Sequence, residues 1–311
     1  RSLRATLDNS APMIQILLRS YDNPVLAAKA IGWQVKAWGP NGEELLGSYM
    51  RDFNQKALAE GRMTTDDWGR QGLHVGGVDT EFTVGNQKGL ALLGKTPGIK
   101  QANRAFGYIG DRVRIEWADD GLKDMMKAGR TLQDIIDSGD ARGLSLAANA
   151  ATGYSGKKFG GSLGEMLMFA PKFLQARLET LTRFGQAMVR DPLGSVEAVP
   201  LVGASMRRNL AKDGMVRDIP IRQRETRRAM LRMIGGAVSL TVLANEMQGE
   251  ETDFRPMVKD KNGDWNYNSN FIRIRFKGND YSLLGTWDSL ARMLVLTGMG
   301  KPHEGVMGLA S

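Results

Sequence analysis

A long stripe of apolar residues at helical spacing constrains the fold of this chain more than any other feature. The stripe consists of Ile99, Ala102, Phe106, Ile109, Val113 and Trp117. Apolar positions three and four apart lie on one face of an α-helix, and such a face must be buried against other elements. We therefore predict a core-facing helix that opens at Pro97, in a fold that is mainly helical.

Two helices are predicted before this stripe. Asp22 and Asn23 followed by Pro24 form a helix start, because a capping side chain precedes proline at the first helical position. The predicted apolar face of this first helix is Ala28, Ile31, Val35 and Trp38. The helix should stop at Gly39-Pro40. A second helix carries Leu46, Tyr49, Phe53 and Ala57 and should end at Gly61, and we expect residues 62–96 to be an irregular connection.

Further helices are predicted downstream of the stripe. One begins near Thr131, and another carries Leu174, Leu178, Leu181 and Met188 and ends at Asp191-Pro192. Residues 153–164 should form an exposed glycine-rich loop, and residues 192–218 have a mixed pattern. A long helix is expected from Pro220 to about Gln248. Its second half, residues 233–244, is apolar but shorter than the ~20 residues of a membrane span, so it should be a buried core helix, with insertion into an assembled pore as the alternative.

The apolar period changes near the C-terminus. Residues 271–276 alternate with a period of two, and residues 277–280 (KGND) have the composition of a hairpin turn, after which Tyr281 should begin a return strand. Asn262-Gly263 is a second turn signal, and Leu290 to Leu296 should form a last helix. The predicted fold is mainly α, a multi-helix chain that is elongated or loosely bundled, with one small β-hairpin near the C-terminus. Its regions are expected at residues 1–96, 97–218 and 219–311.

Positive charge is concentrated in one part of the chain. Residues 157–232 contain 15 basic and 7 acidic residues, and this surplus equals the net charge of +8 of the whole chain. Such a block suits phosphate backbones, anionic headgroups or an acidic protein partner, or it is an ordinary solvated surface. The arginines predicted to contact nucleic acid or an acidic partner are Arg207, Arg208, Arg222, Arg224, Arg227, Arg228 and Arg232. Binding to nucleic acid through them should be directed at the backbone and sensitive to salt.

Few residues are placed for catalysis or metal binding. The chain has no cysteine, which excludes disulfides and cysteine-based zinc sites or nucleophiles. His74 and His303 are far apart in sequence, and the acidic pairs at 119–120 and 250–251 are typical of solvated helix ends or loops. Tyr154 and Ser155 lie in the glycine-rich loop without an evident base. We therefore predict no catalytic residues, no metal ligands and no cofactor.

Residues 89–96 (GLALLGKT) match the spacing of a phosphate-binding loop, with Gly94, Lys95 and Thr96 as its nucleotide contacts. In such loops successive backbone N–H groups surround phosphates at the start of a helix. The context here is different, because the variable positions are bulky and apolar and Pro97-Gly98 follow at once. No alternation of strands and helices surrounds the match. We therefore expect no nucleotide site, with a nucleotide-dependent enzyme that uses Lys95 and Thr96 as a weaker alternative.

Several short motifs resemble, in order along the chain, the large polyvalent protein-associated domains of bacteriophages and mobile elements. Residues 7–12 (LDNSAP) with Gln15 resemble the opening element of that family. Residues 95–99 (KTPGI) and 104–106 (RAF) resemble its K-x-PG-V…RAF element. Residues 13–14 depart from the usual basic position of the opening element.

The resemblance continues through the second half of the chain. Residues 151–153 (ATG) resemble a recurring turn, and residues 169–173 (FAPKF) resemble an F-S-P-R segment. Residues 272–280 followed by Gly285 resemble the hairpin of the family, which residues 276–277 enlarge here. Nearly the whole chain is covered.

The resemblance implies a non-enzymatic structural segment of a large phage protein. It is similar to the giant internal virion proteins of short-tailed phages, which are ejected ahead of the genome and form a conduit across the cell envelope. The chain begins with Arg1, and we expect it to be part of a longer protein. Expected partners are other copies of the chain, other virion proteins, the DNA phosphate backbone and the host envelope after ejection, and the expected location is the virion. The alternative is a scaffold for a catalytic module elsewhere in the parent chain, such as a peptidoglycan lyase, a virion RNA polymerase or an anti-defence enzyme.

Overall fold

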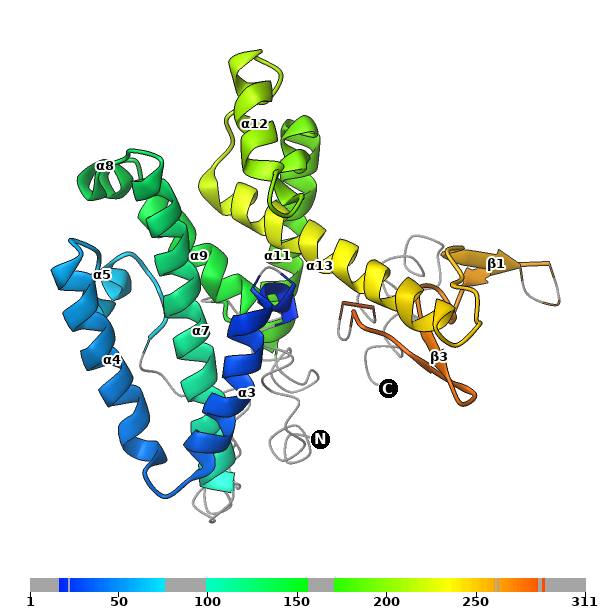
Figure 1. The fold of residues 1–311 in the computed structure, drawn as a ribbon, viewed down its shortest axis with the longest axis horizontal. Coiled ribbons are helices and arrows are strands. Elements are labelled where there is room, and N and C mark those ends of the chain that lie inside the picture. Colours follow the sequence, from blue (N-terminus) through cyan, green and yellow to red (C-terminus); the bar gives the residue numbers. More distant parts are fainter. Residues whose placement is uncertain are drawn as a thin grey trace. The chain divides into compact units, whose positions relative to one another are not determined.

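The computed structural model describes residues 17–75 except 22, residues 99–155, and residues 171–288 except 260, 262, 285 and 286. The chain divides into two compact units, Arg1–Arg232 and Met233–Ser311. The predicted regions 1–96 and 97–218 both belong to the first unit. The described residues are mainly helical, as the sequence predicts, with two small antiparallel sheets in the second unit (Figure 1).

Helix α3 (Pro24–Trp38) starts and stops where the sequence predicts. The Asn23 side chain accepts a hydrogen bond from the Leu26 N–H at 3.0 Å, and Pro24 is the first helical residue. At the other end, Arg104 donates from Nε to the Ala37 carbonyl at 2.9 Å and from Nη2 to the Gly39 carbonyl at 2.8 Å. These bonds satisfy carbonyl groups that the end of a helix leaves without a partner.

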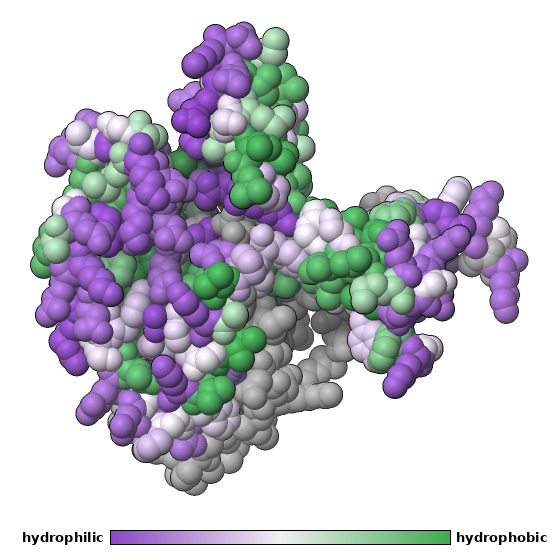
Figure 2. All heavy atoms as spheres, in the orientation of Figure 1, coloured by the Kyte–Doolittle hydropathy of each residue, from purple (hydrophilic) through white to green (hydrophobic). Residues whose placement is uncertain are grey.

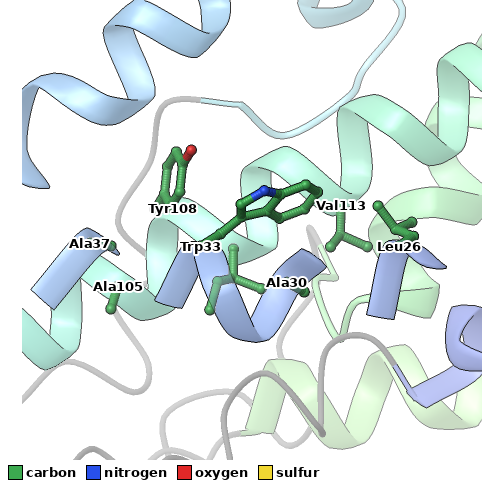
Figure 3. Packing of buried hydrophobic residues seen from close by; sticks show 8 residues of the cluster. Leu26, Ala30, Trp33, Ala37, Ala105, Tyr108 and Val113 are labelled. Carbon is green, nitrogen blue, oxygen red and sulfur yellow. The ribbon is translucent and has the colours of Figure 1, made fainter. Parts of the chain in front are cut away.

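The core of the first unit lies between α3 and the long helix α7 (Ile99–Lys127) (Figure 3). Its buried members are Leu26, Ala30, Trp33 and Ala37 from α3 and Ala105, Tyr108, Ile109 and Val113 from α7. Helix α4 (Gly42–Ala59) packs against both helices and adds Leu45, Leu46 and Tyr49 at the edge. The predicted stripe of α7 is thus confirmed at positions 102, 109, 113 and 117, which are all buried.

The predicted apolar face of α3 is wrong. Ile31 and Val35 are 53% and 70% exposed, whereas the buried face is the adjacent one that contains Trp33. Both faces have helical spacing, so the period alone does not decide between them. The observed choice buries the large indole of Trp33, and the small Ala30 and Ala37 let α7 approach closely.

Two six-residue helices of the first unit begin in the same way. These are α5 (Thr65–Arg70), which lies inside the connection predicted to be irregular, and α8 (Leu132–Asp137), predicted near Thr131. Each follows a threonine, Thr64 or Thr131, whose hydroxyl accepts from the third backbone N–H of the helix while the aspartate there bonds back. This reciprocal capping box satisfies two backbone donors at each start.

Helix α9 (Asp140–Ala151) lies against α7, and its Gly143 meets the start of α13 (Ile221–Glu246). A Cβ atom at position 143 would lie 2.3 Å from Ile221 Cγ2. Ile221 is β-branched and cannot rotate away easily. We predict that Gly143→Ala lowers the free energy of unfolding by about 1–3 kcal/mol, measured by urea denaturation.

Gly185 in α11 (Pro171–Arg190) provides the matched control for that substitution. It is also helical, but nothing lies within 4 Å of a Cβ built there. Gly185→Ala should therefore stabilise the chain by about 0.5–1 kcal/mol, because alanine favours the helix. If Gly143→Ala also stabilises the chain, there is room for a Cβ atom between position 143 and Ile221, and the prediction is wrong.

The helices predicted from Leu174 and from Pro220 are confirmed as α11 and α13, and the mixed segment between them contains the 3-10 helix η1 (Leu193–Ala198) and α12 (Gly203–Lys212). In the apolar half of α13, Met233, Ala237 and Thr241 are buried, but Leu240 and Leu243 are 50% and 54% exposed. The predicted burial of residues 233–244 therefore holds for one face only.

The described residues of the second unit form two hairpins where the sequence predicts one. Strand β1 (Met257–Lys259) pairs with β2 (Trp265–Tyr267), across the turn signal that includes Gly263. Strand β3 (Ile274–Phe276) pairs with β4 (Asn279–Tyr281), with Phe276 opposite Asn279. Its turn is therefore only Lys277-Gly278, with φ values of 50° and 78°, as a two-residue turn of the hairpin type requires. The last predicted helix, at residues 290–296, lies outside the described residues.

Candidate functional site

Helix α13 carries five of the seven arginines that the sequence singles out. Arg224, Arg228 and Arg232 are four residues apart and share one face of the helix. In the first unit this part of α13 contacts η1 and the end of α11 through the side chains described below, and Arg207 of α12 lies near the same carboxylates. From the sequence we predicted that these arginines face outward and contact a partner. Most of them instead contact carboxylates or carbonyls of the chain itself.

Arg227 and Asp191 form the most deeply buried of these pairs. Both side chains are 1% exposed, and Arg227 Nη1 lies 3.1 Å from Asp191 Oδ2. The same nitrogen donates to the Asp191 carbonyl. Asp191 Oδ1 accepts from the backbone N–H groups of Gly194 at 3.2 Å and Arg217 at 3.0 Å. Asp191, which follows α11 directly, therefore holds Arg227 of α13 and the backbone at Arg217, shortly before α13, next to the end of α11.

Gly194 makes this pair possible. A Cβ atom at position 194 would lie 1.8 Å from Asp191 Oδ2 and 2.5 Å from Arg227 Nη2. Any larger residue there would displace one of the two charged groups. The carboxylate and guanidinium occupy the space that this glycine leaves.

Glu197 in η1 is the second carboxylate that receives arginines. Arg224 Nε donates to its two oxygens at 2.8 and 2.9 Å, and Arg224 Nη2 donates to Oε1 at 2.6 Å. Arg207 Nε of α12 lies 3.3 Å from Oε2. Burial acts to raise the pKa of Glu197, but the hydrogen bond and charge of Arg224, with Arg228 and Arg207, outweigh it and leave that pKa below its ordinary value. Glu197 is therefore ionised and bound at neutral pH.

The remaining arginines of the set have varied surroundings. Arg222 Nη2 donates to Glu179 Oε2 at 2.8 Å, and Arg228 Nη2 lies 2.7 Å from Glu225 Oε2. Arg232 Nε donates to the Ala198 carbonyl at 3.1 Å. Arg208 is exposed on α12. We call the group formed by Asp191, Glu197, Arg207, Arg224 and Arg227 the arginine–carboxylate cluster.

The arginine–carboxylate cluster has consequences for the predicted contacts. Arg227 is not accessible to a nucleic acid or an acidic partner in this fold, and Arg224 already has a bidentate carboxylate. Binding to an external partner through Arg208 stays a prediction. Sequence reasoning missed Asp191 and Glu197, although an acidic residue within the apolar segment VEAV is a signal of a buried ion pair.

The other candidate residues are placed as follows. His74 stacks on Tyr154 with ring centroids 3.8 Å apart, and Ser155 Oγ donates to Glu179 Oε1 at 2.9 Å. The expectation that the acidic pair at 119–120 is solvated at a helix end or loop is wrong for Asp119, which lies inside α7, is 2% exposed and pairs with Arg62, while Asp120 pairs with Arg19. Gly94, Lys95, Thr96 and His303 lie outside the described residues.

Within residues 17–75, 99–155 and 171–288, apart from the few positions left out, no group of three or more His, Cys, Asp or Glu side chains is arranged to hold a metal ion. In the same part of the chain, no helix has the length and apolarity that crossing a membrane requires. Comparisons with protein-family models, with curated proteins and with solved structures find no match for this chain.

Proposed function

We propose that this chain is a non-catalytic structural segment of a large bacteriophage protein, carried in the virion and part of an assembly that delivers the genome. Its partners are other copies of the chain or other virion proteins. Contacts with the DNA backbone, and with the host envelope after ejection, belong to the same proposal.

The observation that carries this proposal is the arginine–carboxylate cluster. Three arginines of the basic block, Arg207, Arg224 and Arg227, contact two carboxylates in it, and these contacts join α12 and α13 to η1 and the end of α11. Buried charge pairs cost desolvation energy, and in some proteins they specify one arrangement of the elements that they join. A segment whose arginines hold its own helices in place fits a structural component.

Two short segments that carry the phage resemblance also have structural tasks, which supports the same proposal. Arg104 of the RAF element caps α3, as described above. Thr152 of the ATG turn accepts a hydrogen bond from Arg114 Nε at 2.8 Å, and Arg114 pairs with Asp111 in a bridge that is 1% exposed on both sides. These residues hold helices together, as the shared residues of a structural segment would.

The test is mass spectrometry of purified virions of the phage that encodes this chain. We expect peptides from it in intact particles and their loss from particles that have ejected their genome. Peptides of a phage protein made only in the infected cell provide the control, and these should be absent. Intact virions that lack peptides of this chain would end the proposal.

A further inference from the structure

Apolar side chains are exposed together where the chain passes from α11 through η1 into α12. Figure 2 shows hydrophobic residues gathered over this part of the first unit, in the upper part of the view. We call this region the apolar tip, and its members are Val189, Leu193, Val199, Leu201, Val202 and Met206. Val189 is 83% exposed and Leu201 is fully exposed, at 103%. Large apolar side chains exposed together are a mark of an interaction site.

Leu201 is displayed by a strained turn. Its φ is 67°, and the Val202 N–H donates to the Pro200 carbonyl at 2.8 Å. A hydrogen bond between residues two apart around a positive φ is a rare and strained γ-turn, which disfavours a bulky residue. The chain therefore keeps a leucine in solvent at a position where glycine would be less strained. At this exposure the Leu201 side chain is not packed against any part of the first unit that the structure describes.

The exposed charges of the segment that carries the apolar tip are mostly basic. Between residues 189 and 218 the exposed charged side chains are the basic Arg190, Arg208, Lys212 and Arg217 and the acidic Asp213 and Asp218. The other two acidic residues of that stretch, Asp191 and Glu197, are buried in the arginine–carboxylate cluster. Exposed basic side chains therefore outnumber exposed acidic ones in this segment by four to two.

We propose that the apolar tip binds the surface of an anionic lipid membrane. Apolar side chains that enter the headgroup boundary, together with arginine or lysine beside them, are the combination that interfacial binding to anionic lipid requires. A nucleic acid matches the charge but offers no apolar phase for Leu201, Val202 and Val189. The tip would be present even in a chain that is absent from virions, so this proposal and the proposed function can fail separately.

Flotation of the 311-residue chain with lipid vesicles tests the proposal. We expect binding to phosphatidylcholine vesicles that contain about 30% phosphatidylglycerol, and much weaker binding to phosphatidylcholine alone. Leu201→Gly should weaken binding about tenfold, because it removes one large apolar group from the interface. It should also leave the thermal unfolding temperature unchanged or raised, because it relieves the γ-turn. Arg190→Gln and Arg208→Gln should each weaken binding about fivefold.

Helix α4 offers the matched controls. Leu58 is 68% exposed and Lys56 is exposed, both far in sequence from the apolar tip. Leu58→Gln and Lys56→Gln should leave vesicle binding unchanged. Three results would overturn the proposal: no binding to the anionic vesicles, equal losses for the tip and control variants, or a loss of binding by the tip variants only to a DNA duplex. Tip variants that abolish self-association instead would assign this surface to a second copy of the chain.

Discussion

Replacing Asp191 with alanine is expected to lower the free energy of unfolding of the first unit by about 3–5 kcal/mol. The substitution leaves the guanidinium of Arg227 buried at 1% exposure without its carboxylate. It also removes the acceptor for the backbone N–H groups of Gly194 and Arg217. An unpaired buried charge costs far more than a lost surface contact. Urea denaturation followed by circular dichroism measures the loss.

The double variant Asp191→Asn with Arg227→Met removes both buried charges but keeps side chains of similar size, so it shows how much of the lost stability comes from the unpaired charge. Asparagine keeps an oxygen for the two backbone N–H groups, while both buried charges disappear, so most of the lost stability should return. Arg70→Ala provides the surface control, because the Arg70–Asp67 pair is 76% and 38% exposed and should contribute less than about 1 kcal/mol. An Asp191→Ala loss as small as that of Arg70→Ala would contradict the buried role of this pair.

Replacing Asn245 with alanine is expected to loosen the β3–β4 hairpin without unfolding the first unit. Asn245 is fully buried in α13, and its Nδ2 donates to the Arg273 carbonyl at 2.9 Å. Its Oδ1 accepts from the Arg275 N–H at 2.9 Å. Alanine would leave both backbone groups without a partner, at a cost of about 2–3 kcal/mol. The amides of β3 and β4 should then exchange with deuterium roughly 30- to 100-fold faster.

Gln248→Ala is the control that tests whether the faster hydrogen exchange of the β3–β4 hairpin is specific to the loss of Asn245. Gln248 lies near the same end of α13, is exposed, and bonds only within its own turn through the Ala244 carbonyl at 2.7 Å. Its replacement should leave hairpin exchange unchanged. Amides of α7 should keep their exchange rates in both variants. Faster exchange throughout the chain after Asn245→Ala would mean that the side chain stabilises more than the hairpin.

The sequence predicted the helices well where local signals decide. Asn23-Pro24 begins α3, Asp191-Pro192 follows the end of α11, and the spacing of the α7 stripe appears in its buried face. Capping residues, prolines and the spacing of apolar residues act over a few positions, so they can be recognised in the sequence without knowledge of the fold. The buried face of α3 could not be predicted in this way. Packing against α7 determines which face is buried, and α7 lies more than sixty residues away in sequence.

The candidate site was predicted only in part, for a related reason. The arginines of α13 could be located, but the partners of Arg227 and Arg224 lie 36 and 27 residues away, at Asp191 and Glu197. A charged residue has the same sequence pattern whether it faces solvent or an internal carboxylate. Its orientation is set by the carboxylates of Asp191 and Glu197, which the fold brings next to α13 and which no local pattern encodes.

The two capping boxes bear on the order in which this chain folds. A helix of six residues is too short to persist in water, because forming its first turn costs more than its few hydrogen bonds return. Helices α5 and α8 bury Trp68 and Ile135, respectively, and Thr64 and Thr131 hold their first turns. They should therefore become ordered only after the long helices have assembled, and their amides should be among the first to open again in the native state.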